Sequence, residues 1–148
     1  MIVIGSDHGG LNLKTALKSY LNRRGIDIID AGTDNGDSVD YPDFGLKVAE
    51  KVVSGEAESG ILICGTGIGM SIAANKVPGI RAALVTDVFM ARMAKEHNNA
   101  NILVLGGRVL DEQNACTLVE AWLDASFEGG RHQGRLDKIV EIENKYCK

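Results

Sequence analysis

Short runs of branched apolar residues alternate along this chain with longer stretches of helical period, and this alternation restricts the fold more than any other feature of the sequence. Residues 61–64 (ILIC) and 102–105 (ILVL) are apolar without interruption, which is typical of strands buried on both faces. Because a helical stretch separates each strand from the next, the strands are expected to run parallel, joined by right-handed crossovers. The pattern predicts a doubly wound α/β fold with helices on both faces of the sheet.

The expected elements follow from the same periodicities. Strands are expected at residues 2–6, 26–30, 60–64, 82–85 and 102–105, and helices at residues 11–24, 43–54, 70–76, 88–96, 111–127 and 134–145. Asp43 after Pro42 and Asp87 are typical helix starts, and Gly25 is a typical helix end. A chain of 148 residues can build one sizeable core, so we expect a single domain over 1–148.

The charge balance limits the class of partner. Lys and Arg total 16 and Asp and Glu total 20, so the formal net charge is −4 and the overall field does not favour nucleic acid or anionic membranes. An anionic ligand must therefore be held by a local cluster of positive groups. Apolar stretches fall short of the ~20 residues that a membrane span requires, and the sequence opens on a strand rather than a signal segment, so we expect a cytoplasmic protein.

The chain has three cysteines, Cys64, Cys116 and Cys147, without CxxC or CxxxH spacing. This usage fits a reducing compartment and argues against a disulfide framework and against a zinc site.

Polar residues follow several of the expected strands. In an open parallel sheet, ligands bind beyond the carboxyl ends of the strands, which share one edge. Asp87 is most simply the N-cap of the following helix, whereas His8, beside an acid and two glycines, favours a functional role. The residues at these strand ends are Asp7, His8, Cys64, Thr86, Asp87 and Arg108.

A glycine-rich loop, Gly-Thr-Gly-Ile-Gly at 65–69, separates one apolar run from the next helix. It departs from the dinucleotide fingerprint GxGxxG, and the chain lacks a Walker motif. Three glycines before a helix let backbone N–H groups converge, and the helix dipole adds positive potential there. The loop is therefore an expected anion cradle, with a tight turn that binds nothing as the alternative.

Cys64 lies directly before this loop. A cysteine at the end of a buried strand is usually a small hydrophobic residue, but a position beside converging amides favours a thiolate. Such a thiol suits either a general base or a nucleophile, and His97 with Asn98 is the pair that a cysteine hydrolase would require. Both interpretations stay open, as does a role for His97 as a helix-terminal residue only.

The segment EGGRHQGR near the end of the chain places Arg131 and Arg135 four residues apart. If the segment is helical, both guanidinium groups share a face. Such charges are usually solvated, but together with Arg108 they are the best candidates for a phosphate site in this acidic chain.

Taken in order, these motifs resemble the ribose-5-phosphate isomerase B family. The likeness runs over essentially the whole chain and rests on the joint order and spacing of the motifs. They are Asp7-His8, Cys64 with the 65–69 loop, SIAANK at 71–76, His97-Asn98, GGRV at 106–109 and EGGRHQGR at 128–135.

The resemblance implies a Rossmann-like three-layer αβα sandwich with a five-stranded parallel sheet. It implies homodimers, sometimes tetramers, with the C-terminal helix at the dimer interface and active sites shared between subunits. The implied reaction interconverts D-ribose 5-phosphate and D-ribulose 5-phosphate, a step of the pentose phosphate pathway, and needs no metal or cofactor.

In such enzymes the cysteine matching Cys64 is the base, and the histidine matching His97 assists the opening of the furanose ring. We expect an enediolate intermediate, with Thr66 orienting the thiol and Asp7 assisting at the O1 and O2 hydroxyls. The expected substrate-binding residues are Asp7, His8, Tyr41, Gly65, Thr66, Gly67, Ile68, Gly69, Asn98, Arg108, Arg131 and Arg135.

One branch of the family lacks the cysteine and has a glutamate directly after the last loop glycine. Met70 occupies this position here, which assigns the chain to the cysteine type. Allose 6-phosphate remains an alternative substrate, and galactose 6-phosphate is a less favoured one because its isomerase subunits also depart from the cysteine pattern. A Rossmann-type nucleotide-binding module remains the alternative from another class.

Overall fold

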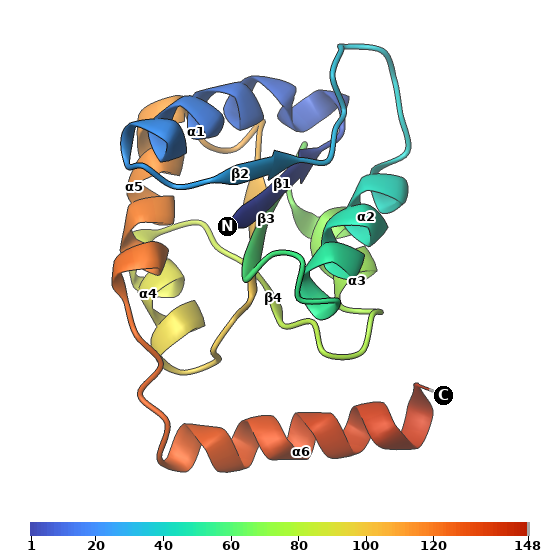
Figure 1. Ribbon diagram of the computed structural model, residues 1–148, viewed down its shortest axis with the longest axis vertical. Helices are drawn as coiled ribbons and strands as arrows, with labels where there is room; N and C mark the ends of the chain where they lie inside the picture. Colours follow the sequence, from blue (N-terminus) through green and yellow to red (C-terminus); the bar gives the residue numbers. More distant parts are fainter. Residues whose placement is uncertain (148) are drawn as a thin grey trace.

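A computed structural model describes residues 1–147 and shows a sheet between two layers of helices (Figure 1). The strands are β1 (Ile2–Ser6), β2 (Ile28–Asp30), β3 (Ser59–Cys64), β4 (Ala82–Leu84) and β5 (Ile102–Gly106). Their order is β2-β1-β3-β5-β4, and every neighbouring pair is parallel. The predicted five-stranded α/β fold is therefore confirmed. Lys148, the last residue of the expected domain, lies outside the described residues.

The helices divide between the two faces of the sheet. A short 3-10 turn, η1 (His8–Gly10), precedes α1. Helices α1 (Leu11–Arg23), α4 (Val88–Glu96) and α5 (Glu112–Asp124) pack on one face, and α2 (Tyr41–Val53) and α3 (Ile68–Ala74) pack on the other (Figure 1). Side chains of β3 alternate between the two resulting cores, so that Ile63 belongs to the first and Cys64 to the second. The thiol thus lies on the side of α2 and α3.

Three helices begin earlier than predicted, and one of them, α6 (Arg131–Tyr146), begins at Arg131 instead of residue 134. Helix α2 begins at Tyr41 instead of residue 43, because Pro42 fits the first turn of a helix, where its missing N–H has no partner to lose. Helix α3 begins at Ile68 instead of residue 70, directly after Gly67, whose positive φ of 83° ends the loop.

Other boundaries also differ from the prediction. Strand β2 is shorter than predicted, since pairing with β1 covers only its last three residues, and α5 ends at Asp124 instead of residue 127. Helix α4 occupies its predicted range, and Asp87 caps it by accepting a 2.8 Å hydrogen bond from the N–H of Met90. Gly25 follows α1 with φ 73°, as a helix-ending glycine does.

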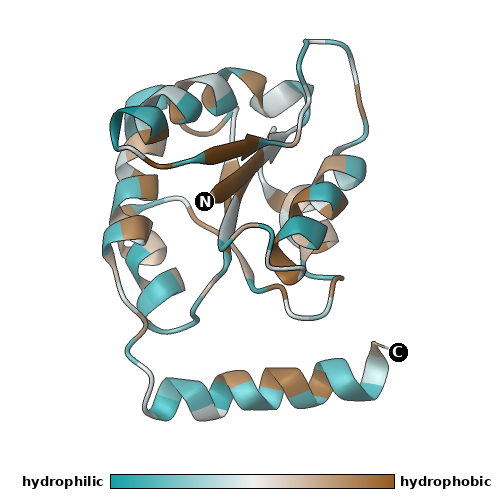
Figure 2. Ribbon diagram, in the orientation of Figure 1, coloured by the Kyte–Doolittle hydropathy of each residue, from teal (hydrophilic) through white to brown (hydrophobic). Residues whose placement is uncertain are grey.

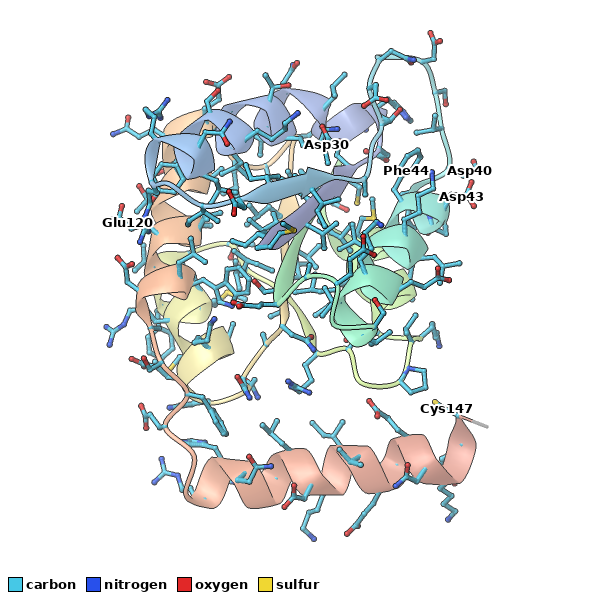
Figure 3. All side chains as sticks on the ribbon, viewed as in Figure 1. Asp30, Asp40, Asp43, Phe44, Glu120 and Cys147 are labelled. Atoms are coloured by element: carbon cyan, nitrogen blue, oxygen red, sulfur yellow. The ribbon has the colours of Figure 1, made fainter. Side chains whose placement is uncertain are left out.

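The last helix, α6 (Arg131–Tyr146), lies along one end of the molecule, apart from the two helical layers (Figure 1). Only His132 and Leu136 are buried on it. Figure 2 shows a mainly hydrophilic helix with apolar residues in its middle, where Ile139, Val140 and Ile142 are exposed. Figure 3 shows Cys147 at its far end. None of the helices in residues 1–147 is long and apolar enough to cross a membrane.

Candidate active site

One group of predicted residues gathers where β1, β3 and β5 end. Asp7 follows β1, Cys64 ends β3 and Arg108 follows β5, and these strands are neighbours in the sheet. Together with the glycine loop and α2, they form an open hollow of about 460 Å³. Its lining residues are Asp7, Tyr41, Cys64, Gly65, Thr66, Ile68, Gly69, Ile72 and Arg108.

The thiol of Cys64 is held by the loop that follows it. Its Sγ accepts a hydrogen bond from the N–H of Gly67 at 3.2 Å, and the side chain is almost completely buried. The Oγ1 of Thr66 accepts from the N–H of Ile68 at 3.2 Å, which leaves the Thr66 hydroxyl hydrogen free to donate. The loop therefore directs one amide at the sulfur and a second at the Thr66 oxygen.

The loop glycines also have a steric role that the sequence did not reveal. A Cβ added to Gly65 would lie 3.1 Å from Nη1 of Arg108, and one added to Gly69 would overlap the ring of Tyr41. These two side chains thus lie directly on the loop backbone. A larger residue at either position would displace a predicted substrate-binding group.

Asp7 and His8 are fixed by backbone contacts. Asp7 is 7% exposed, and its Oδ1 accepts from the N–H of Gly10 at 3.2 Å. Nδ1 of His8 accepts from the N–H of Val39 at 3.2 Å. The proton of the neutral His8 ring is therefore on Nε2, which makes that nitrogen a donor.

A second group of predicted residues, His97, Asn98, Arg131 and Arg135, lies at the opposite edge of the sheet. Helix α4 starts beyond the carboxyl end of β4 and runs back, so His97 and Asn98 follow it at the amino edge. There the carbonyl of Asn101 accepts from the N–H of Gly60 at the start of β3. Cys64 lies four residues further along this strand, roughly 13 Å at about 3.3 Å per residue.

The start of α6 joins this second group. The N–H of Glu128 donates to the carbonyl of Glu96 at 3.0 Å, and Gly129 and Gly130 follow with φ of 67° and 56°. This turn places the His132 ring on the His97 ring, with centroids 4.1 Å apart and planes 17° from parallel. His132 was not among the predicted site residues, because helical spacing singled out only the arginines on either side of it.

Asn98 lines a cavity of about 320 Å³ between α6 and the edge of the sheet. The cavity is mostly apolar and includes Leu136 and Ile139 of α6, together with Arg81 at the start of β4. Arg131 and Arg135 are exposed on the same helix. Of the second group, only Asn98 is among the residues that line this cavity.

The positions of these residues argue against two alternatives, the cysteine hydrolase and the dinucleotide-binding module. Within one chain, His97 and Asn98 cannot orient Cys64 as a hydrolase pair would, because α4 carries them to the other edge. A dinucleotide site would need an acid roughly 20 residues after the glycine loop, and Asp87, which lies near that position, is occupied in capping α4.

Comparisons with known proteins agree with the fold and with the family that the motifs resemble. A family model described as Ribose/Galactose Isomerase matches residues 2–139. Ribose-5-phosphate isomerase B of Escherichia coli is 45% identical over 144 residues, covering 97% of each chain. The structure of Clostridium thermocellum ribose-5-phosphate isomerase B is 62% identical with a TM-score of 0.97, covering 98% of each chain. The Mycoplasma genitalium enzyme, crystallised with bound ribulose-5-phosphate, is 44% identical with a TM-score of 0.94, covering 97% of this chain and 96% of its own.

Proposed function

The chain belongs to the ribose/galactose isomerase family, and we infer that it is an aldose–ketose isomerase that interconverts D-ribose 5-phosphate and D-ribulose 5-phosphate. The relatives carry this activity in their names, and one of them binds ribulose-5-phosphate. The observation in this chain that best supports the chemistry is the buried thiol of Cys64 with the N–H of Gly67 directed at its sulfur, in a hollow that also holds Asp7 and Arg108.

Isomerisation moves one proton between neighbouring carbons. In the proposed mechanism the Cys64 thiolate removes the proton from C2 of the open-chain aldose, and the electron pair forms an enediolate. The same group returns a proton to C1 while the proton of the O2 hydroxyl passes to O1, which gives the ketose. A positioned general base contributes about 10²- to 10⁴-fold to such a step.

The enediolate needs donors near its oxygens. The amides of Gly65, Thr66 and Gly69 and the hydroxyl of Thr66 are the groups of the loop that remain for this role, because the Gly67 amide is directed at the sulfur and the Ile68 amide at the Thr66 oxygen. One well-placed donor is worth about 3 kcal/mol in the transition state. Asp7 would assist at the O1 and O2 hydroxyls from the end of β1.

Ring opening and phosphate binding require the second group, which we assign to a partner copy of the chain. In a two-fold dimer each chain gives its Cys64 hollow to one site and its His97 group to the other. The exposed Ile68 and Ile72 beside the hollow, and the unpaired apolar face of α6, support this arrangement. Arg108 and His8 of one chain, with Arg131 and Arg135 of its partner, would hold the phosphate.

The cysteine type of the family fits this chain. Met70 is fully buried in the core beneath the loop, so no carboxylate base stands at that position. Allose 6-phosphate and galactose 6-phosphate are not favoured, since the named relatives are ribose-5-phosphate isomerases.

We place the reaction in the pentose phosphate pathway and the protein in the cytoplasm, where free cysteines such as Cys64 and Cys116 stay reduced.

The decisive assay measures ribulose 5-phosphate formed from ribose 5-phosphate, with and without a chelator, and repeats it with allose 6-phosphate. We expect conversion of the pentose that the chelator does not change. Calorimetry with AMP and NAD tests the nucleotide-binding alternative. Tight binding of either one without isomerase activity would replace the proposed function.

A further inference from the structure

His132 is a buried histidine that the mechanism above does not use. It is 6% exposed, lies between the two exposed arginines of α6 and stacks face to face on His97. Its Nε2 is 3.7 Å from Oε2 of Glu128, beyond hydrogen-bond distance. The His97 ring is therefore its main polar neighbour.

The three groups are close enough to suggest a metal site, but their orientation argues against one. Ligand atoms of His97, Glu128 and His132 all lie within 4.8 Å of one another. Imidazoles that bind one ion point their nitrogen lone pairs, which lie in the ring planes, at a common point. Here the planes are 17° from parallel and stacked, so the lone pairs run side by side.

We infer that His132 is a positioning residue for His97: its buried ring is the platform on which the His97 ring lies, and it sets the orientation in which His97 moves the proton that opens the sugar ring. This inference rests on the proposed function of His97. His97 itself is partly exposed and follows the last residue of α4, and within residues 1–147 no hydrogen bond holds its ring. Stacking on His132 therefore restricts the orientation of the His97 ring.

The charges around His132 support this role. The groups that face it are His97 at the end of α4, Glu128 in the connecting segment, and Arg131 and Arg135 on α6. Burial lowers the pKa of His132, the positive neighbours lower it further, and Glu128 only partly opposes them. His132 is therefore neutral near pH 7, and a neutral platform lets His97 gain and release a proton without like-charge repulsion.

The same turn of α6 thus serves two purposes. Arg131 and Arg135, which we assign to the phosphate, flank the residue that orients His97. Gly129 and Gly130 make the turn possible, because both have positive φ, and Gly130 combines φ 56° with ψ −128°, a region that is open essentially to glycine alone. A single structural unit, the turn at Gly129 and Gly130 with the start of α6, therefore positions the groups for both phosphate binding and ring opening.

The test separates ring opening from proton abstraction. D-Ribulose 5-phosphate cannot close a furanose ring, because its O5 carries the phosphate. Exchange of its C1 hydrogen with deuterium from D₂O therefore requires the base and the enediolate but no ring step, and NMR can follow it. Net conversion of ribose 5-phosphate requires both steps.

We expect His132→Ala to lower conversion at least about tenfold while C1 exchange stays within about twofold of the wild-type rate. His132→Phe, which keeps a flat ring on His97, should restore most of the conversion. Gln133→Ala is the matched control, since its side chain pairs with Asp137 on the exposed side of α6, and it should change neither rate.

Equal losses of conversion and exchange in His132→Ala, or no loss of conversion, would overturn the inference. If thermal melting shows that His132→Ala does not fold, the test uses His132→Phe instead. A conversion rate of His132→Phe as low as that of His97→Asn would then overturn the inference. Absence of C1 exchange in the wild-type chain would refute the proposed function and this inference with it, so the two failures are distinguishable.

Discussion

Cys64 and His97 lie at opposite edges of the same sheet, Cys64 at the carboxyl end of β3 and His97 beyond the end of α4 at the amino edge. If both act on one substrate, they come from different chains. Cys64→Ala and His97→Asn should each be inactive alone, and mixing the two after mild unfolding should restore activity. Random pairing gives half heterodimers with one intact site each, so we expect about a quarter of the wild-type activity.

The control for this experiment uses two changes in the same group. Asp7→Asn and Cys64→Ala both damage the hollow at the carboxyl ends of the strands. Their heterodimer has one defect in each site, so mixing them should restore nothing. Recovery in this control, or no recovery in the first mixture, would mean that the site is not shared in this way.

Replacement of the thiol tests the base directly. Cys64→Ala should lower kcat by at least about 10²-fold, because no other described side chain of the hollow offers a comparable base at the sulfur position. Melting temperature should change little, since the side chain is small. Cys116→Ala is the matched control, and a Cys64→Ala enzyme with near-normal turnover would show that another group removes the proton.

The sequence predicted the strands and most helices because burial on both faces leaves a clear apolar signal, as in 61–64 and 102–105. The alternation of strands and helices also predicts a split site, because a helix that follows a strand ends at the opposite edge of the sheet, so His97 cannot reach Cys64 within one chain. The His97–His132 stack was beyond sequence reasoning, since it depends on the positive φ of two consecutive glycines and on where α6 turns.

Asp30, labelled in Figure 3, ties α1 to the end of β2. Burial by itself raises the pKa of this carboxyl, but hydrogen bonds from Lys14, Lys18 and the N–H of Gly32 outweigh it, and the pKa lies below its usual value. Lys14 is 2% exposed and would be left without its counter-charge in Asp30→Asn. We expect Asp30→Asn to lower the free energy of unfolding at pH 7 by about 3 kcal/mol.

The sign of the pH dependence follows from this lowered pKa. The carboxylate contributes its stabilisation above the unfolded-state pKa of about 4 and loses it as the pH falls through the lower folded-state value. Urea unfolding of wild type and Asp30→Asn at pH 7, 5 and 3 should show a difference that is constant between pH 7 and 5 and smaller at pH 3. A difference that grows on acidification would contradict the assignment.

Phosphate binding tests the arginines of both edges. Arg108 lies over Gly65 in the hollow, whereas Arg135 is exposed on α6. A hydrogen bond to a charged group is worth about 1.5–3 kcal/mol, so Arg108→Ala and Arg135→Ala should each raise KM by roughly 10- to 100-fold with a smaller change in kcat. Inhibition by inorganic phosphate should weaken in parallel. Lys138→Ala, an exposed cation on α6, should leave both quantities unchanged. If Arg108→Ala weakens phosphate inhibition and Arg135→Ala does not, the phosphate is held at the carboxyl edge of one chain alone, and the partner's share of the site is limited to ring opening.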